Sequence, residues 1–150
     1  MNNIFNTPLA MATRAAIILS ARPNKKRDEK SITAIDLLAT HAYSYKLAGF
    51  NLHGDVEKPS IELAARTHHM REGIKFAVTK GLLTPLAEEG NYLLAINDLG
   101  LQFLSKLDAA YVGDYKFVLN SVLAFIDTRT YEEVIAFITQ TDIQGEQHGR

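Results

Sequence analysis

The spacing of apolar residues changes from helical to extended at Gly81, and this change narrows the folds that are open to the chain. Residues 61–81 carry one apolar helix face and end in a lysine and a glycine, which suit the last turn and the left-handed cap of a helix. Residues 82–86 and 92–96 have the extended pattern of two strands, and turn-forming residues join them. The sequence therefore predicts a helix followed directly by a β-hairpin, with Pro85 on an edge strand.

Two helices are expected before this unit. Thr7 suits a helix cap and a proline follows it, so the first helix is expected over residues 8–20. Ser31 is the expected cap of a second helix, which runs to about Leu47 and has Tyr43 on its buried side.

Further helices are expected after the hairpin. Asn97 suits the cap of a fourth helix, and apolar residues at intervals of three and four continue the helical pattern over residues 111–126. Thr130 and Glu133 form a capping-box signature for a last helix, which is expected to end at about Thr139.

The order of these elements predicts the fold class. Three helices, a two-stranded ribbon and a further helix follow one another as in a winged helix-turn-helix with a β wing. We therefore expect a mainly α chain with a winged-helix domain in residues 1–108. Residues 109–150 are expected to form a C-terminal helical extension that packs on this domain or on a partner.

The composition excludes several classes of function. The chain has 150 residues, a formal net charge of -1 and no cysteine. This balance excludes DNA binding driven by a global positive field, and the lack of cysteine excludes a disulfide scaffold, a thiol nucleophile and a cysteine-based zinc site. The sequence also lacks a phosphate-binding glycine loop and a nucleophile elbow. We expect no enzyme activity and no catalytic, cofactor-binding or metal site.

No apolar stretch of the sequence has the length that a membrane span requires. We therefore expect a cytoplasmic protein without membrane contact.

One face of the helix before the hairpin carries His68, Arg71 and Lys75 beside the apolar side. In a helix-turn-helix protein this helix enters the major groove, where arginine and lysine contact phosphates or guanine edges. Glu72 lies next to this set, so DNA contact, partner contact and a solvated face are all open at this point.

A second cationic set lies in the loop between the first two helices. It consists of Arg22, Lys25, Lys26 and Arg27, with Lys30 following after two acidic residues. These four residues are candidates for contact with DNA or a partner, and a solvated loop is the alternative.

Aromatic residues point to a subunit interface in the C-terminal helices. The apolar positions of residues 111–126 cover a wider arc than one small core requires, and Phe117 lies outside even this arc. The following helix repeats the excess with Tyr131 and Phe137. Monomers rarely expose such a patch, so these three residues are expected to dock a partner subunit or a second copy.

Five segments resemble a known family, the middle component of bacterial three-component ABC-ATPase conflict systems, which include Lamassu. The resemblance covers about Asn6 to Val122 and lies in residues 6–9, 14–19, 34–41, 71–83 and 99–104. It implies a winged-helix accessory subunit that joins an ATPase of the structural-maintenance-of-chromosomes (SMC) or Rad50 type to an effector, commonly a nuclease. Such complexes act in defence against phage or plasmid DNA, which implies double-stranded DNA as a further partner of the complex.

The sequence therefore leaves two alternative functions open. The first is a non-catalytic subunit that bridges an ATPase and an effector, and the second is a freestanding winged-helix transcription regulator. A regulator should dimerise and carry a clearly basic recognition face, whereas this chain is close to neutral. The charge balance favours the subunit.

Overall fold

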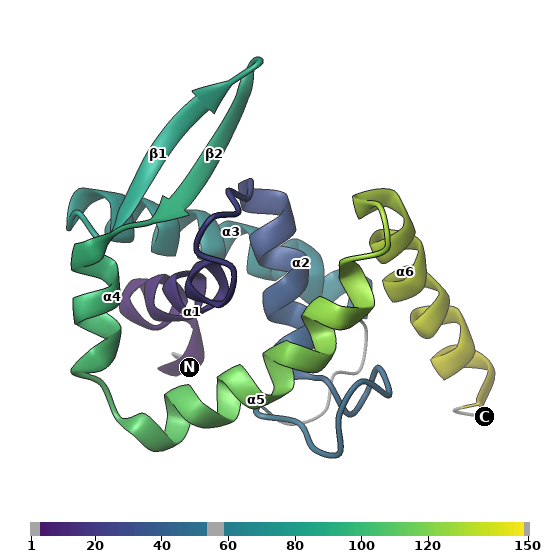
Figure 1. Cartoon of the computed structure of the whole chain (residues 1–150). Helices are drawn as coiled ribbons and strands as arrows, with labels where there is room; N and C mark the ends of the chain where they lie inside the picture. The colour runs from purple at the N-terminus through teal and green to yellow at the C-terminus, as the bar shows by residue number, and fades with distance from the viewer. Residues whose placement is uncertain (1–3, 54–58, 149–150) are drawn as a thin grey trace.

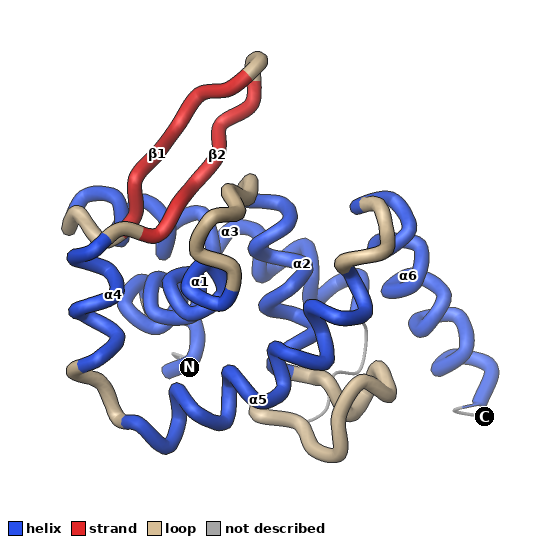
Figure 2. The backbone as a smooth tube through the Cα atoms, in the orientation of Figure 1, coloured by secondary structure: helices blue, strands red, loops and turns tan. Residues whose placement is uncertain are grey.

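The computed structural model describes residues 4–53 and 59–148, with side chains described for residues 5–53 and 60–140 (Figure 1). The described residues are mainly helical and include one two-stranded antiparallel sheet, so the mainly α class with a β-hairpin is confirmed (Figure 2). The elements in chain order are η1 (Ile4–Asn6), α1 (Pro8–Ala21), α2 (Glu29–Thr40), α3 (Pro59–Thr79), β1 (Leu83–Glu88), β2 (Asn91–Ile96), α4 (Asp98–Ser105), α5 (Ala109–Ile126) and α6 (Tyr131–His148).

Helix α1 is the centre of the fold and lies across α3 (Figure 1). The Thr7 side chain accepts a hydrogen bond from the Ala10 amide at 3.1 Å, which confirms the predicted cap. Gly73 of α3 allows the two helices to cross closely, because a Cβ at that position would stand 2.3 Å from the Met11 Cβ. The close crossing buries most of α1.

The start of α2 differs from the prediction. Asp28, not Ser31, is the cap residue: its Oδ1 accepts a hydrogen bond from the Ser31 amide at 2.8 Å, and the helix begins at Glu29. Both side chains are good cap formers, and the aspartate comes first in the chain.

The end of α2 was also predicted wrongly, because the helix ends at Thr40 and not near Leu47. Asn51 explains this end: its Oδ1 accepts hydrogen bonds from the Tyr43 and Ser44 amides at 2.9 and 3.2 Å, which would otherwise bond along a continued helix. The chain therefore turns away from the helix, and Tyr43 is 60% exposed where the sequence placed it on a buried side.

The tip of the hairpin projects from the helices, whereas its base packs on them through the buried Leu83 and Leu94 (Figure 2). Its register runs from Leu83 opposite Ile96 to Glu88 opposite Asn91, and the two-residue turn has positive φ at both positions, as a type I′ turn requires. On its other side β2 forms a bridge from Leu94 to Arg27. Pro85 therefore lies on an edge strand, as predicted.

Helix α4 is held against the base of the hairpin. The Asn97 Oδ1 accepts a hydrogen bond from the Gly100 amide at 2.9 Å, which confirms the predicted cap. Its Nδ2 donates to the carbonyl oxygen of Gly81 at 2.9 Å. A side chain at Gly100 would meet the Leu82 carbonyl oxygen at 2.3 Å, so glycine permits this contact.

The last two helices share the core of the earlier ones. Helix α5 packs on α1 and α2, and α6 packs on α2 and α3. Reciprocal hydrogen bonds of 2.9 and 3.1 Å between Thr130 and Glu133 confirm the capping box. The predicted end near Thr139 was too early, since α6 continues to His148. No helix in the described ranges has the length and apolar character to cross a membrane.

Candidate interaction surfaces

A buried ionic cluster holds four helices together and fixes where their outer faces lie. Asp36 of α2 is fully buried and accepts hydrogen bonds from Arg14 of α1, Arg66 of α3 and Tyr115 of α5. The Tyr115 hydroxyl donates to Oδ1 at 2.6 Å, and the Arg66 Nη1 donates to Oδ2 at 3.2 Å. Burial alone would raise the pKa of Asp36, but the two guanidinium groups outweigh it and hold this pKa below its usual range.

This cluster was missed from the sequence. Its members come from helices far apart in the chain, and no local spacing relates them. The available signals were single charged residues inside apolar runs, namely Arg14 in α1 and Asp36 in α2. The acid and its partners are buried together, so the cluster links α1, α2, α3 and α5 inside the fold.

The predicted α3 face is exposed at all three positions. His68, Arg71 and Lys75 lie at intervals of three and four residues and share one side of the helix. The Arg71 Nε donates to the Glu29 Oε1 at 2.8 Å, so a carboxylate at the start of α2 already partners this guanidinium. Contact of this face with DNA stays a prediction.

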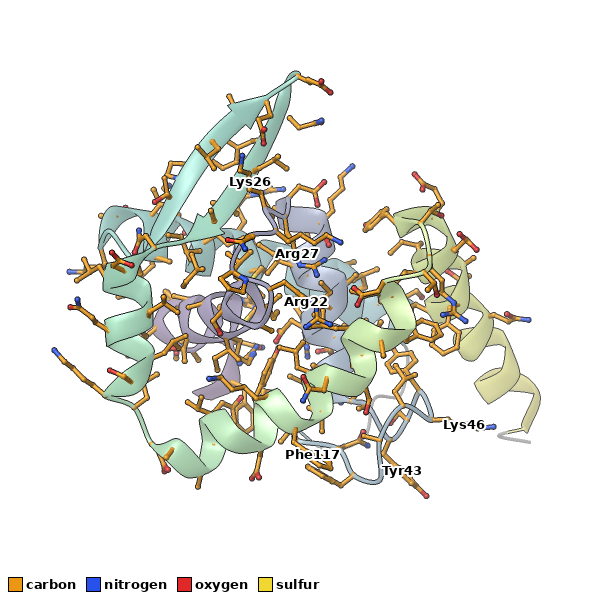
Figure 3. The ribbon with its side chains drawn as sticks, in the orientation of Figure 1. Arg22, Lys26, Arg27, Tyr43, Lys46 and Phe117 are labelled. Carbon is orange, nitrogen blue, oxygen red and sulfur yellow. The ribbon has the colours of Figure 1, made fainter. Side chains whose placement is uncertain are left out.

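The four loop cations differ in their partners and in their burial, and Figure 3 labels three of them, Arg22, Lys26 and Arg27. Arg22 pairs with Asp127 of α5 at 3.1 Å, and Lys26 pairs with Glu88 of β1, also at 3.1 Å. Lys25 is exposed, whereas the Arg27 side chain is only 6% exposed. The loop is therefore tied to α5 and to the hairpin, and one of its cations is turned inward.

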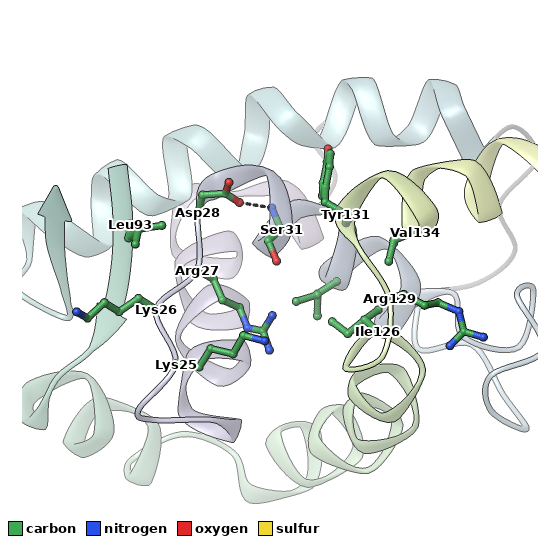
Figure 4. Close-up of a pocket in the computed structure, with 12 residues that line it drawn as sticks. Lys25, Lys26, Arg27, Asp28, Ser31, Leu93, Ile126, Arg129, Tyr131 and Val134 are labelled. Carbon is green, nitrogen blue, oxygen red and sulfur yellow. Dashed lines mark hydrogen bonds between the residues drawn. The ribbon is translucent and has the colours of Figure 1, made fainter. Parts of the chain in front are cut away.

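Arg27 borders a pocket of about 280 Å³ between this loop, β2 and the turn from α5 to α6 (Figure 4). Its backbone exchanges two hydrogen bonds with Leu94, of 3.1 and 2.9 Å, which fix the residue beside β2. The pocket is lined by Lys25, Lys26, Arg27, Asp28, Ser31, Ala34, Ile35, Leu93, Ile126, Arg129, Tyr131 and Val134. It combines apolar walls with several cationic residues.

Phe117 is the most exposed of the predicted interface residues, at 66% of its surface. Its ring stacks on that of Phe50, with centroids 6.5 Å apart, and Phe50 is itself 41% exposed. Tyr43 belongs to the same loop as Phe50 and lies at the same end of the molecule in Figure 3. We call Tyr43, Phe50 and Phe117 the aromatic surface.

Tyr131 and Phe137 lie apart from the aromatic surface. Tyr131 is 38% exposed and borders the Arg27 pocket. Phe137 is half-buried, and its ring packs against Phe125 and Tyr45, with centroids 4.6 and 5.9 Å away. The three residues predicted as one interface therefore occupy three different environments in the isolated chain, and contact of Tyr131 and Phe137 with a partner stays a prediction.

These features define a small helical protein with a projecting hairpin, a cationic pocket and an exposed aromatic surface. In the part of the chain that the structure describes, no three His, Asp or Glu side chains are grouped to hold a metal ion. The model of the family "ABC-three component (ABC-3C) system Middle Component 2" matches residues 4–146. The chain belongs to this family, which confirms the resemblance to middle components of three-component ABC systems. Comparisons with curated proteins and with solved structures gave no match.

Proposed function

We propose that the chain is a non-catalytic subunit that joins an SMC-like or Rad50-like ABC ATPase to an effector, most simply a nuclease. Membership of a middle-component family supports this proposal, because a middle component of a three-component system has partner components. We place the complex in Lamassu-type defence against phage or plasmid DNA in the cytoplasm, on the strength of the sequence resemblance.

The aromatic surface is the observation that best supports docking of a partner component. Phe117 leaves 66% of its surface in water although the core of the chain is complete without it. Burying such a ring at an interface contributes about 1.5–3 kcal/mol, and exposed aromatic patches mark binding sites more often than chance surface. We assign this surface to the contact with one of the two partner components.

The order of α1, α2, α3 and the hairpin supports a winged helix, with α3 in the position of the recognition helix. We propose that the complex binds double-stranded DNA and that His68, Arg71 and Lys75 take part through phosphate contacts. The Arg71 pair with Glu29 favours this auxiliary role over a freestanding transcription regulator, since a regulator needs this face free for base edges.

Co-expression of the chain with the other two components of the system tests the proposal. We expect the chain to purify in one complex with a large ATPase, and to hydrolyse neither ATP nor DNA when purified alone. A stable homodimer that binds one operator sequence without the other components would instead establish the transcription regulator. ATP turnover by the isolated chain would contradict the non-catalytic role.

A further inference from the structure

Arg27 presents two buried donors that the fold leaves unused. Neither its Nε nor its Nη2 has a hydrogen-bond partner among the described residues, although the side chain is only 6% exposed. These two atoms form one edge of the guanidinium group, which can donate two parallel hydrogen bonds. The same edge of Arg14 binds a carboxylate in this chain, because its Nε and Nη2 donate to the two oxygens of Asp36.

The acids near Arg27 are already engaged. Asp127 pairs with Arg22 at 3.1 Å, and the Asp28 carboxylate accepts the Ser31 amide at 2.8 Å. Burial and the neighbouring Arg22 lower the pKa of Arg27, while Asp127 works against them. An arginine stays protonated at neutral pH, so a buried positive charge lies in the wall of the pocket.

Lys25 adds a second cation at the same place. Figure 4 shows the Lys25 and Arg27 side chains extending toward the same part of the pocket, whereas Lys26 and Arg129 extend away from it. Lys26 pairs with Glu88, and the Arg129 guanidinium lies 3.9 Å from the centre of the Phe125 ring. Arg27 and Lys25 are therefore the cations available to an anion in the pocket.

Most of the remaining lining is apolar and consists of Ala34 and Ile35 of α2, Leu93 of β2, Ile126 of α5 and Val134 of α6. Asp28, Ser31 and Tyr131 complete it. An apolar wall beside a guanidinium edge suits a carboxylate that is carried next to an aliphatic group. A DNA backbone suits the pocket less well, because its phosphates carry no aliphatic group for these walls.

We infer that this pocket binds a carboxylate from an acidic and partly apolar segment of a partner protein, with the Nε and Nη2 of Arg27 donating to its two oxygens. Lys25 adds charge attraction at the mouth, and the apolar walls receive the neighbouring aliphatic group. The identity of the partner as a component of the same complex rests on the proposed function. The chemistry of the pocket does not.

A titration of the isolated full chain with small probes tests the inference without any partner. We expect hexanoate to move the Arg27 Nε–Hε resonance in NMR spectra and to leave that of Arg14 unchanged. If about two of its four additional methylene groups are buried, hexanoate should bind roughly tenfold more tightly than acetate. Hexanoate should bind more tightly than inorganic phosphate or a short DNA duplex, and hexanol should leave the Arg27 resonance in place.

Two variants complete the test. Arg27→Met removes a buried charge without a partner, so we expect the free chain to melt at the same or a higher temperature and to lose its stabilisation by hexanoate. Lys26→Gln is the matched control in the same loop, and it should keep the wild-type response. Hexanoate that leaves the Arg27 resonance unmoved, or phosphate or DNA binding more tightly than hexanoate, would overturn the inference. Destabilisation by Arg27→Met with hexanoate binding retained would also overturn it, since Arg27 would then serve the fold alone.

Discussion

Arg14 of α1 donates two hydrogen bonds, of 2.8 and 3.1 Å, to the two carboxylate oxygens of Asp36 of α2. Both side chains are almost completely buried, and Tyr115 of α5 donates to the same carboxylate. The pair therefore lies at the junction of the N-terminal helices with a helix of the C-terminal part. Residues on both sides of position 108 stabilise one another, so the outer face of α5 is held in a fixed position.

Replacing Asp36 should destabilise the whole chain. In Asp36→Asn, two buried guanidinium groups lose the charge that compensates them, and we expect a loss of about 3–5 kcal/mol in the free energy of unfolding. Urea unfolding followed by circular dichroism measures this loss. Asp127→Asn is the control, because it breaks an exposed ion pair and should cost less than about 1 kcal/mol. Equal effects of the two changes would contradict the structural role of Asp36.

His53 should make stability depend on pH. Burial, with a smaller contribution from Arg14, lowers the pKa of His53 to about 3, and its ring lies 3.0 Å from the Tyr111 hydroxyl and stacks on Phe5. As pH falls below about 6.5, the unfolded chain takes up a proton here that the folded chain does not. The free energy of unfolding should therefore decrease as pH falls from about 6.5 toward 3. In His53→Gln this part of the slope should vanish, and an unchanged slope would show that His53 is readily protonated in the folded chain.

Alanine substitutions at two helical glycines should change the stability of the chain in opposite directions. At Gly73 the new Cβ would stand 2.3 Å from the Met11 Cβ and 2.9 Å from a backbone nitrogen, so Gly73→Ala must push α1 away from α3 and should cost about 1–3 kcal/mol or more. At Gly113 no atom lies within 4 Å, so Gly113→Ala should stabilise α5 by up to about 1 kcal/mol. Thermal unfolding of the two variants compares them directly. A stabilising Gly73→Ala would show that the two helices do not cross as closely as described.

The α3 face should affect DNA binding through charge. The double change Arg71→Glu with Lys75→Glu removes two exposed cations and should weaken DNA binding by the assembled complex and reduce its dependence on salt. The fold should survive, because neither side chain is part of the core. Binding measured at several salt concentrations checks this. An unchanged salt slope would mean that the face is solvated or meets protein.

Local sequence signals predicted most helix starts because each depends on residues a few positions apart. The caps at Thr7 and Asn97 and the capping box at Thr130 are of this kind. The end of α2 could not be predicted in this way, because Asn51, eleven residues beyond Thr40, supplies the oxygen that binds the next amides. The failure concerned a contact between residues that are separate in the chain.

The candidate interaction surfaces were also predicted only in part, because some of their features depend on contacts between residues that are distant in the chain. The cationic loop was visible as composition, but burial of Arg27 depends on its backbone pairing with Leu94, which lies in a distant strand. Phe117 was identified correctly as an exposed aromatic residue, because helical periodicity alone places it away from the apolar face. Phe137 follows the same periodicity but packs on Phe125 and Tyr45, and only the fold brings Tyr45 to it.

Assembly of the complex with a Phe117→Asp variant is the most direct test of the proposed docking role. The ring is 66% exposed, so the isolated variant should melt at the wild-type temperature, yet it should lose one of its two partner components on purification. Leu101→Asp is the matched control, since Leu101 of α4 is 42% exposed and lies outside the aromatic surface, and this variant should assemble normally. Normal assembly by Phe117→Asp, or a lower melting temperature with assembly retained, would show that Phe117 does not dock a partner.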